Sequence, residues 1–100
     1  MSGQKIMIVE DEPAIADTIR YSLSTEGFET VCFNSGGPVM AHLASEPIDL
    51  IILDIGLPDI NGFELCKEIR KTCPIPIIFL TARAGEIHHG GVLAVLTLSV

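Results

Sequence analysis

Three short apolar runs in this chain each end in polar residues suited to phosphate or metal chemistry. The runs are residues 6–9, 50–53 and 77–80, and such uninterrupted runs are typical of strands buried on both faces of a parallel sheet. The polar residues at their ends are Glu10, Asp11, Asp54 and Thr81. Because parallel strands point the same way, their carboxyl ends gather at one edge, where open α/β folds bind ligands. We therefore expect these four residues to form one small acidic pocket.

Asp54 is the candidate nucleophile of this pocket. An aspartate can accept a phosphoryl group as an acyl phosphate, and the transferring group chiefly needs positioning and a cation. Mg²⁺ suits a site that offers one or two carboxylates and leaves room for water. The backbone carbonyl of Gly56 can add a further ligand, and the Thr81 hydroxyl can donate to a phosphoryl oxygen. Clustered carboxylates repel one another without a cation, which favours a metal site over strand ends and helix caps that are merely polar.

Strands and helices are expected to alternate along the chain. We expect strands over residues 5–9, 28–32, 49–53 and 77–80. Helices are expected after Glu12, after Ser35 as a cap, and after Asn61. This alternation predicts right-handed crossovers and a parallel sheet with helices on both faces.

Composition limits the classes of protein that fit. The chain has 100 residues, 48% of them hydrophobic, which predicts one folded domain at most. Its net charge of −7 disfavours non-specific binding to nucleic acid or an anionic membrane. The three cysteines lack CxxC spacing, so we expect reduced thiols and neither a disulfide nor a zinc site. With no signal peptide and no membrane-length apolar segment, the sequence predicts a cytoplasmic protein.

Three segments resemble the receiver domain of bacterial two-component response regulators. They read IMIVEDEPAIADTI, LIILDIGLPDINGFEL and IPIIFLTA, and the resemblance extends from about Lys5 to Arg83. The segment LPDINGFELCKEIR is similar to regulators in which a winged-helix DNA-binding domain follows the receiver, including the carbon-source-responsive regulators. The resemblance implies an α/β, flavodoxin-like, doubly wound parallel sheet with strand order 2-1-3-4.

The resemblance also assigns a role to each candidate residue. Asp54 would be the phosphoacceptor, with a sensor histidine kinase as donor and partner. Asp11 and Asp54 would bind Mg²⁺, with the Gly56 carbonyl as a third ligand and Glu10 acting through water. Thr81 would be the switch hydroxyl. The chain would then be the input module of a transcription regulator, and an enzyme at most toward its own phosphorylation and dephosphorylation.

The chain departs from the receiver pattern near its end. No lysine or arginine follows Arg83, so the lysine that pairs with the phosphoryl group in the family has no counterpart. We therefore expect a truncated receiver over residues 1–83 and an atypical apolar tail over 84–100, with the fifth strand and last helix missing or replaced. The segment Val92–Val100 is nearly uncharged and rich in β-branched residues, which favours pairing. The short linker Ala82–Gly91 favours antiparallel addition to the sheet edge, or an exchanged dimer.

Two alternatives to a working receiver stay open at this point. One is a structural or interaction fragment whose switch is lost together with the lysine. Self-association through the sheet edge or tail is a separate expectation, and it does not depend on this alternative. The other is a phosphohydrolase of the haloacid dehalogenase type, which normally has a second acid two residues after its aspartate, where this chain has Gly56. In none of these interpretations do we expect this chain alone to bind DNA, or to bind a membrane.

Overall fold

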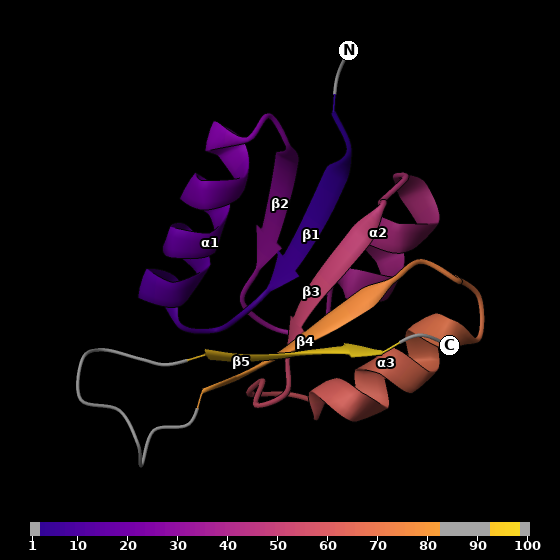
Figure 1. The fold of residues 1–100 in the computed structure, drawn as a ribbon. Helices are drawn as coiled ribbons and strands as arrows, with labels where there is room; N and C mark the ends of the chain where they lie inside the picture. Colours follow the sequence, from indigo (N-terminus) through magenta and orange to yellow (C-terminus); the bar gives the residue numbers. More distant parts are fainter. Residues whose placement is uncertain (1–2, 83–92, 99–100) are drawn as a thin grey trace.

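The computed structural model describes residues 3–82 and 93–98, and within them one sheet has the order β2-β1-β3-β4-β5 (Figure 1). The strands are β1 (Lys5–Val9), β2 (Glu29–Phe33), β3 (Leu50–Asp54), β4 (Ile77–Ala82) and β5 (Leu93–Leu98). β1 to β4 run parallel. This confirms the expected parallel order 2-1-3-4.

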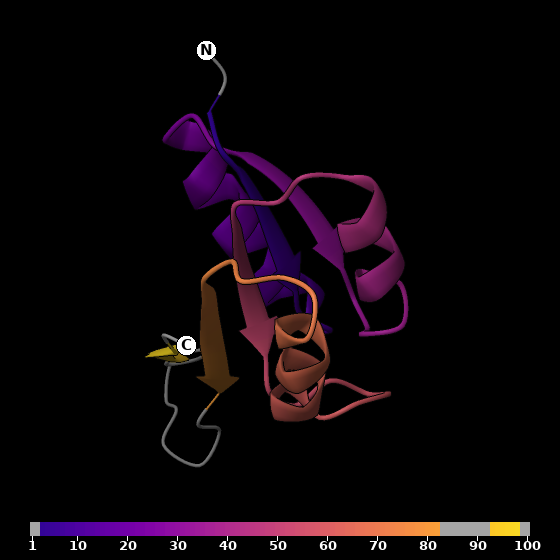
Figure 2. The same cartoon turned by 90° about the vertical axis from the view of Figure 1, so that its right-hand side faces the viewer.

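Helices cover both faces of the sheet. They are α1 (Pro13–Thr25), α2 (Val39–Ser45) and α3 (Gly62–Arg70). α1 lies on one face, and α2 and α3 lie on the other (Figure 2). α1 begins with Pro13, whose missing N–H costs nothing in the first turn, and it is followed by Gly27 at φ 93°. The Asn61 side chain caps α3 by accepting from the Phe63 N–H at 2.7 Å.

The predicted cap of α2 is wrong. Ser35 does not begin this helix, which starts at Val39 after Pro38. A cap at Ser35 would place Pro38 at the third helical position, where the capping side chain needs an N–H that proline lacks. In addition, the Gly36 N–H already donates to Asp59.

Each face of the sheet has its own apolar core, as the uninterrupted apolar runs predict. The buried core beneath α2 and α3 includes Met7, Val9, Val39, Ile51, Leu53, Leu65, Ile69, Ile77 and Phe79. The core beneath α1 is formed by Ile6, Ile8, Ile52 and Leu80, against which Ile19, Leu23 and Phe28 pack. Successive residues of one strand enter opposite cores, so β1, β3 and β4 are fixed in register.

β5 pairs with the edge of β4 in the antiparallel direction. The register runs from Ile77 opposite Leu98 to Ala82 opposite Leu93. The expected antiparallel addition to the sheet edge is therefore confirmed for the backbone of β5. Residues 83–92 and 99–100 lie outside the described residues, and the division of the chain at residue 83 stays a prediction. Within the described part of the chain, no helix combines the length and apolar character needed to cross a membrane.

Candidate functional site

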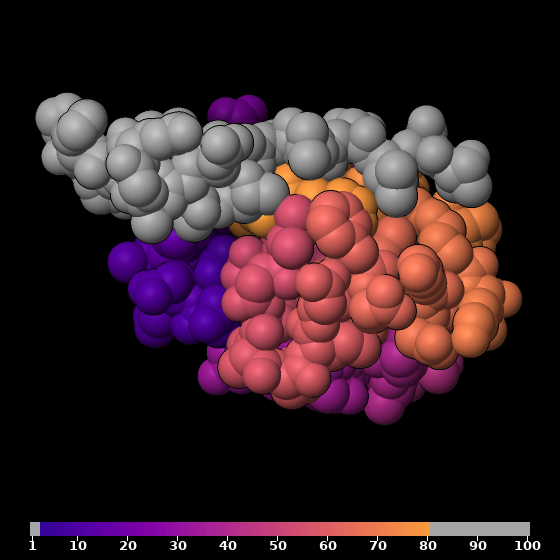
Figure 3. Space-filling model, turned by 90° about the horizontal axis from the view of Figure 1, so that it is seen from below, coloured from indigo at the N-terminus to yellow at the C-terminus, as the bar shows by residue number. Residues whose placement is uncertain are grey.

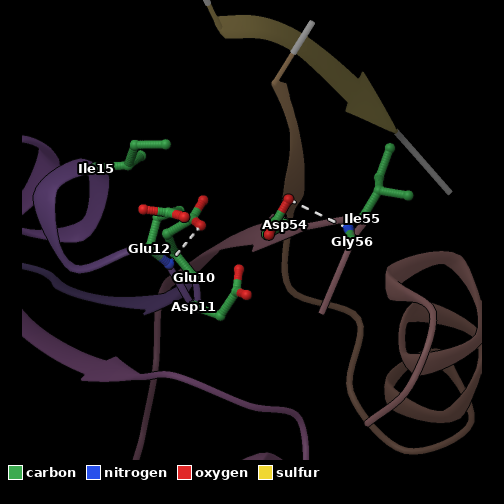
Figure 4. A pocket seen from close by; sticks show the side chains of 7 residues that line it. All are labelled: Glu10, Asp11, Glu12, Ile15, Asp54, Ile55 and Gly56. Atoms are coloured by element: carbon green, nitrogen blue, oxygen red, sulfur yellow. Dashed lines mark hydrogen bonds between the residues drawn. The ribbon is translucent and has the colours of Figure 1, made fainter. Parts of the chain in front are cut away.

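Three of the predicted site residues meet at the carboxyl edge of the sheet. β1 and β3 pair with Val9 opposite Leu53, so Glu10 and Asp11 leave β1 beside Asp54 at the end of β3. Glu10, Asp11 and Asp54 can each supply one carboxylate oxygen within 4.8 Å of the others. Figure 3 looks onto this edge, and Figure 4 shows the carboxylates of Glu10 and Asp11 facing that of Asp54. The convergence expected from the strand ends is present in the structure for these three residues.

Burial makes the charge on Glu10 costly. Glu10 is 5% exposed, and the pKa of its carboxyl is raised from 4.5 to about 7, chiefly by this burial. The charges of Asp54 and Asp11 contribute to this rise, and the Glu12 N–H, which donates to Glu10 Oε2 at 2.9 Å, opposes it. Desolvation and neighbouring like charges both disfavour the ionised form of a carboxyl, whereas a hydrogen bond to that form favours it.

Burial and a backbone hydrogen bond also have opposite effects on the pKa of Asp54. Burial raises the pKa of its carboxyl, the hydrogen bond from the Gly56 N–H lowers it, and Asp11 raises it. The Gly56 N–H lies 3.2 Å from Asp54 Oδ1. The loop after β3 therefore stabilises the ionised form that a nucleophile requires.

Close backbone packing fixes the loop between Asp54 and α3. The Gly62 N–H donates to the Ile55 carbonyl at 2.8 Å, and Gly56 and Asn61 form an isolated antiparallel bridge. A Cβ atom at Gly62 would overlap the carbonyl oxygen of Asp54 and the Cα of Ile55. Only glycine fits there, so Gly62 helps to position Asp54, a role the sequence reasoning missed. An Asn-Gly pair between a buried strand and a helix was the available signal.

An open cavity of about 390 Å³ lies over the cluster. Its lining residues are Glu10, Asp11, Glu12, Ile15, Asp54, Ile55 and Gly56 (Figure 4). Sequence reasoning did not place Glu12, Ile15 or Ile55 in the site. Glu12 adds a fourth carboxylate to the lining, and the two isoleucines add apolar side chains.

Thr81 reaches the same edge of the sheet through its backbone. Asp54 pairs with Leu80, and Thr81 follows within β4. β4 extends to Ala82, beyond the predicted end at Leu80, because Thr81 and Ala82 pair with β5. The side chain of Thr81 is outside what the structure describes, so its switch role stays a prediction.

The donor set of this cluster fits a hard divalent cation. It offers three carboxylates, two of them buried, beside the exposed backbone of Gly56. Within the described residues, the ion pairs of lysine and arginine involve other carboxylates, so no basic side chain neutralises the cluster. Oxygen ligands of this kind suit Mg²⁺, and a bound cation would remove the like-charge repulsion that raises the pKa of Glu10 and Asp54.

Comparisons with known proteins agree with this fold. The family model "Response regulator receiver domain" matches residues 6–95. The chain is 46% identical over 90 residues to the transcriptional regulatory protein CreB of Escherichia coli (strain K12), covering 89% of this chain and 39% of CreB. It is 43% identical over 85 residues to the regulatory protein VanRc of Enterococcus gallinarum, covering 85% of this chain and 37% of VanRc. The chain thus spans about two-fifths of the length of these relatives.

One of the similar solved structures contains a metal complex. The response regulator TrrA of Thermotoga maritima, solved in complex with Mg²⁺-BeF, superposes with a TM-score of 0.74 at 38% identity. The match covers 79% of this chain and 70% of that one.

Proposed function

The chain belongs to the response regulator receiver domain family, and on this premise we propose that it accepts a phosphoryl group on Asp54 from a sensor histidine kinase, with Mg²⁺ bound at the acidic cluster. One observation carries the proposal. The carboxylates of Glu10, Asp11 and Asp54 converge within 4.8 Å at the carboxyl edge of the sheet.

Asp54 is the nucleophile in this proposal. One of its carboxylate oxygens attacks phosphorus and forms the P–O bond of an acyl phosphate, while the P–N bond of the phosphohistidine donor breaks and the released imidazole takes up a proton. Asp54 must be ionised to attack. The Gly56 N–H favours this form, in opposition to the burial of the side chain.

Asp11 and Asp54 would hold Mg²⁺ directly, with Glu10 acting through water and Gly56 offering its carbonyl. When bound, Mg²⁺ supplies positive charge that offsets both the clustered carboxylates and the oxygens of the transferring group. The cavity over the cluster is open, which leaves room for water and for the incoming phosphoryl group.

The proposed biological role is that of a regulatory input module. CreB and VanRc are regulatory proteins, and CreB is a transcriptional one. We infer that this chain corresponds to the input part of a regulator of that kind, with a sensor kinase as its partner. The haloacid dehalogenase alternative is not favoured, because the position of its second acid is occupied by Gly56 and the family model is that of a receiver.

Incubation with Mg²⁺ and a small phosphodonor, followed by intact-mass measurement, tests the proposal. We expect a gain of one phosphoryl group by the wild type and none by Asp54→Ala. No gain by the wild type would support the alternative of a fragment without a working switch.

A further inference from the structure

A hydrogen bond connects the loop after β3 to the loop after β2. The Gly36 N–H donates to Asp59 Oδ1 at 2.8 Å, across 23 positions of sequence. The bond is partly buried although the Asp59 side chain is largely exposed. Asp59 therefore pairs with the backbone of a different loop and does not act as an independent surface charge.

The same two loops pack against each other at Gly36. A Cβ atom built there would lie 2.5 Å from Ile60 Cγ2 and 3.2 Å from Leu65 Cδ2. At the neighbouring Gly37, a Cβ atom would have only an ordinary contact, 3.5 Å from Asp59 Oδ2. In Figure 3 the purple residues that lead into α2 adjoin the salmon residues that follow β3. The close fit means that the hydrogen bond joins surfaces already in contact.

The loop held by Asp59 also carries Gly56. Its base is closed by the hydrogen bond from the Gly62 N–H to the Ile55 carbonyl, and Leu57 is buried in the core beneath α2 and α3. Asp59 lies three residues beyond Gly56, and its bond to Gly36 fixes the outer part of the loop. Gly56 itself lines the cavity and donates to Asp54.

We propose that Asp59 is a positioning residue for the acidic site. By accepting the hydrogen bond from Gly36, Asp59 fixes where Gly56 presents its N–H to Asp54 and its carbonyl to a metal ion. The role requires an acceptor oxygen and not the negative charge of the side chain. This inference rests on the proposed function, because it assigns Asp59 to the same site.

Two pairs of matched variants of the whole chain test the proposal. Asp59→Asn loses the charge but keeps an acceptor oxygen, whereas Asp59→Ala loses both, so their difference isolates the hydrogen bond. Gly36→Ala leaves Asp59 intact and forces the two loops apart at Ile60, whereas Gly37→Ala adds the same methyl group where there is room. The second pair of variants perturbs the contact between the two loops without changing the charge of any residue.

The main measurement is the Mg²⁺ dissociation constant by calorimetric titration, with the melting temperature as a check on folding. Loss of groups that orient a metal site weakens metal binding by about 10–100-fold, and we expect about tenfold for Asp59→Ala and Gly36→Ala because one ligand of several is affected. Asp59→Asn and Gly37→Ala should stay close to the wild type. Equal weakening in Asp59→Asn and Asp59→Ala would make the effect electrostatic and overturn the proposal, as would unchanged binding in Asp59→Ala.

A readout without metal separates this inference from the proposed function. If the wild type binds no Mg²⁺, the proposed function fails, but the amide NMR signal of Gly56 in metal-free protein still tests the role of Asp59. We expect this signal to move in Asp59→Ala and Gly36→Ala and to stay in place in Asp59→Asn and Gly37→Ala. A Gly56 signal that is the same in all four variants would overturn the inference.

Discussion

Gly56 donates its backbone N–H to Oδ1 of Asp54 across 3.2 Å, so the loop after β3 folds back onto the side chain that ends the strand. This bond favours the ionised form of Asp54, while burial of the carboxyl disfavours it. The site thus combines a buried carboxyl with a backbone donor that favours its ionised form.

Mg²⁺ binding should depend on the clustered carboxylates. Replacing Asp11 or Asp54 by asparagine removes a charged oxygen ligand, so both variants should bind Mg²⁺ at least about tenfold more weakly than the wild type. Asp17→Asn is the matched control, since Asp17 lies on α1 in an ion pair with Arg20. Calorimetric titration of the four proteins measures the effect. Equal binding by all four would show that the site assignment is wrong.

Stability without metal should fall as the pH rises through the titration of Glu10. The pKa of this carboxyl is about 7 in the folded chain against 4.5 ordinarily, so between these values the folded state binds a proton that the unfolded state does not. The resulting contribution to the free energy of unfolding is fully present below pH 4.5 and is lost as the pH rises above 7.

The matched variant for this pH dependence is Glu10→Gln, which has no proton to lose. In urea unfolding with a chelator, this variant should exceed the wild type in free energy of unfolding above pH 7, and the difference should shrink toward pH 5. Added Mg²⁺ should reduce the pH dependence of the wild type, because a cation offsets the same charge. A difference between the two proteins that does not vary with pH would contradict the raised pKa of Glu10.

The close approach at Gly62 should make this position intolerant of a side chain. Gly62→Ala forces a methyl group against the backbone of Asp54, and overpacking of this kind costs about 1–3 kcal/mol of unfolding free energy. Gly56→Ala is the control, because a Cβ atom there meets nothing within 4 Å. Urea unfolding of both variants gives the comparison. Equal stability of the two would mean that the loop relaxes away from Asp54.

Deletion of the segment Val92–Val100 should lower stability or solubility. β5 pairs with β4 along six residues, and its removal would leave the edge of β4 with unpaired backbone groups. Urea unfolding measures the first effect, and light scattering reveals whether the segment also holds two copies together. Unchanged mass, stability and solubility after the deletion would show that the segment contributes nothing to the fold.

The parts of this structure that follow from local patterns could be predicted from sequence. The apolar runs ending at Val9, Leu53 and Leu80 specify buried parallel strands, and shared direction then brings Glu10, Asp11 and Asp54 together. The strand order itself rested on resemblance to known receivers, because periodicity does not state which strands are neighbours.

The parts that depend on distant contacts could not be predicted. The Gly36 N–H donates to Asp59, 23 positions away, whereas the local pattern indicated a helix beginning at Ser35. Glu12 and Ile15 enter the cavity because of the direction in which α1 leaves β1, which no spacing in the sequence reports. The need for glycine at position 62 appears only when the backbone of Asp54 is seen against it.

Identifying the residue that carries the phosphoryl group tests the role of Asp54 directly. After incubation with Mg²⁺ and a small phosphodonor, borohydride reduction cleaves an acyl phosphate and leaves homoserine at the acceptor position, which peptide mass spectrometry can locate. We expect homoserine at position 54 in the wild type, absent without Mg²⁺ and absent in Asp54→Ala. A phosphoryl group found on a histidine or serine, or retained in Asp54→Ala, would contradict this role of Asp54.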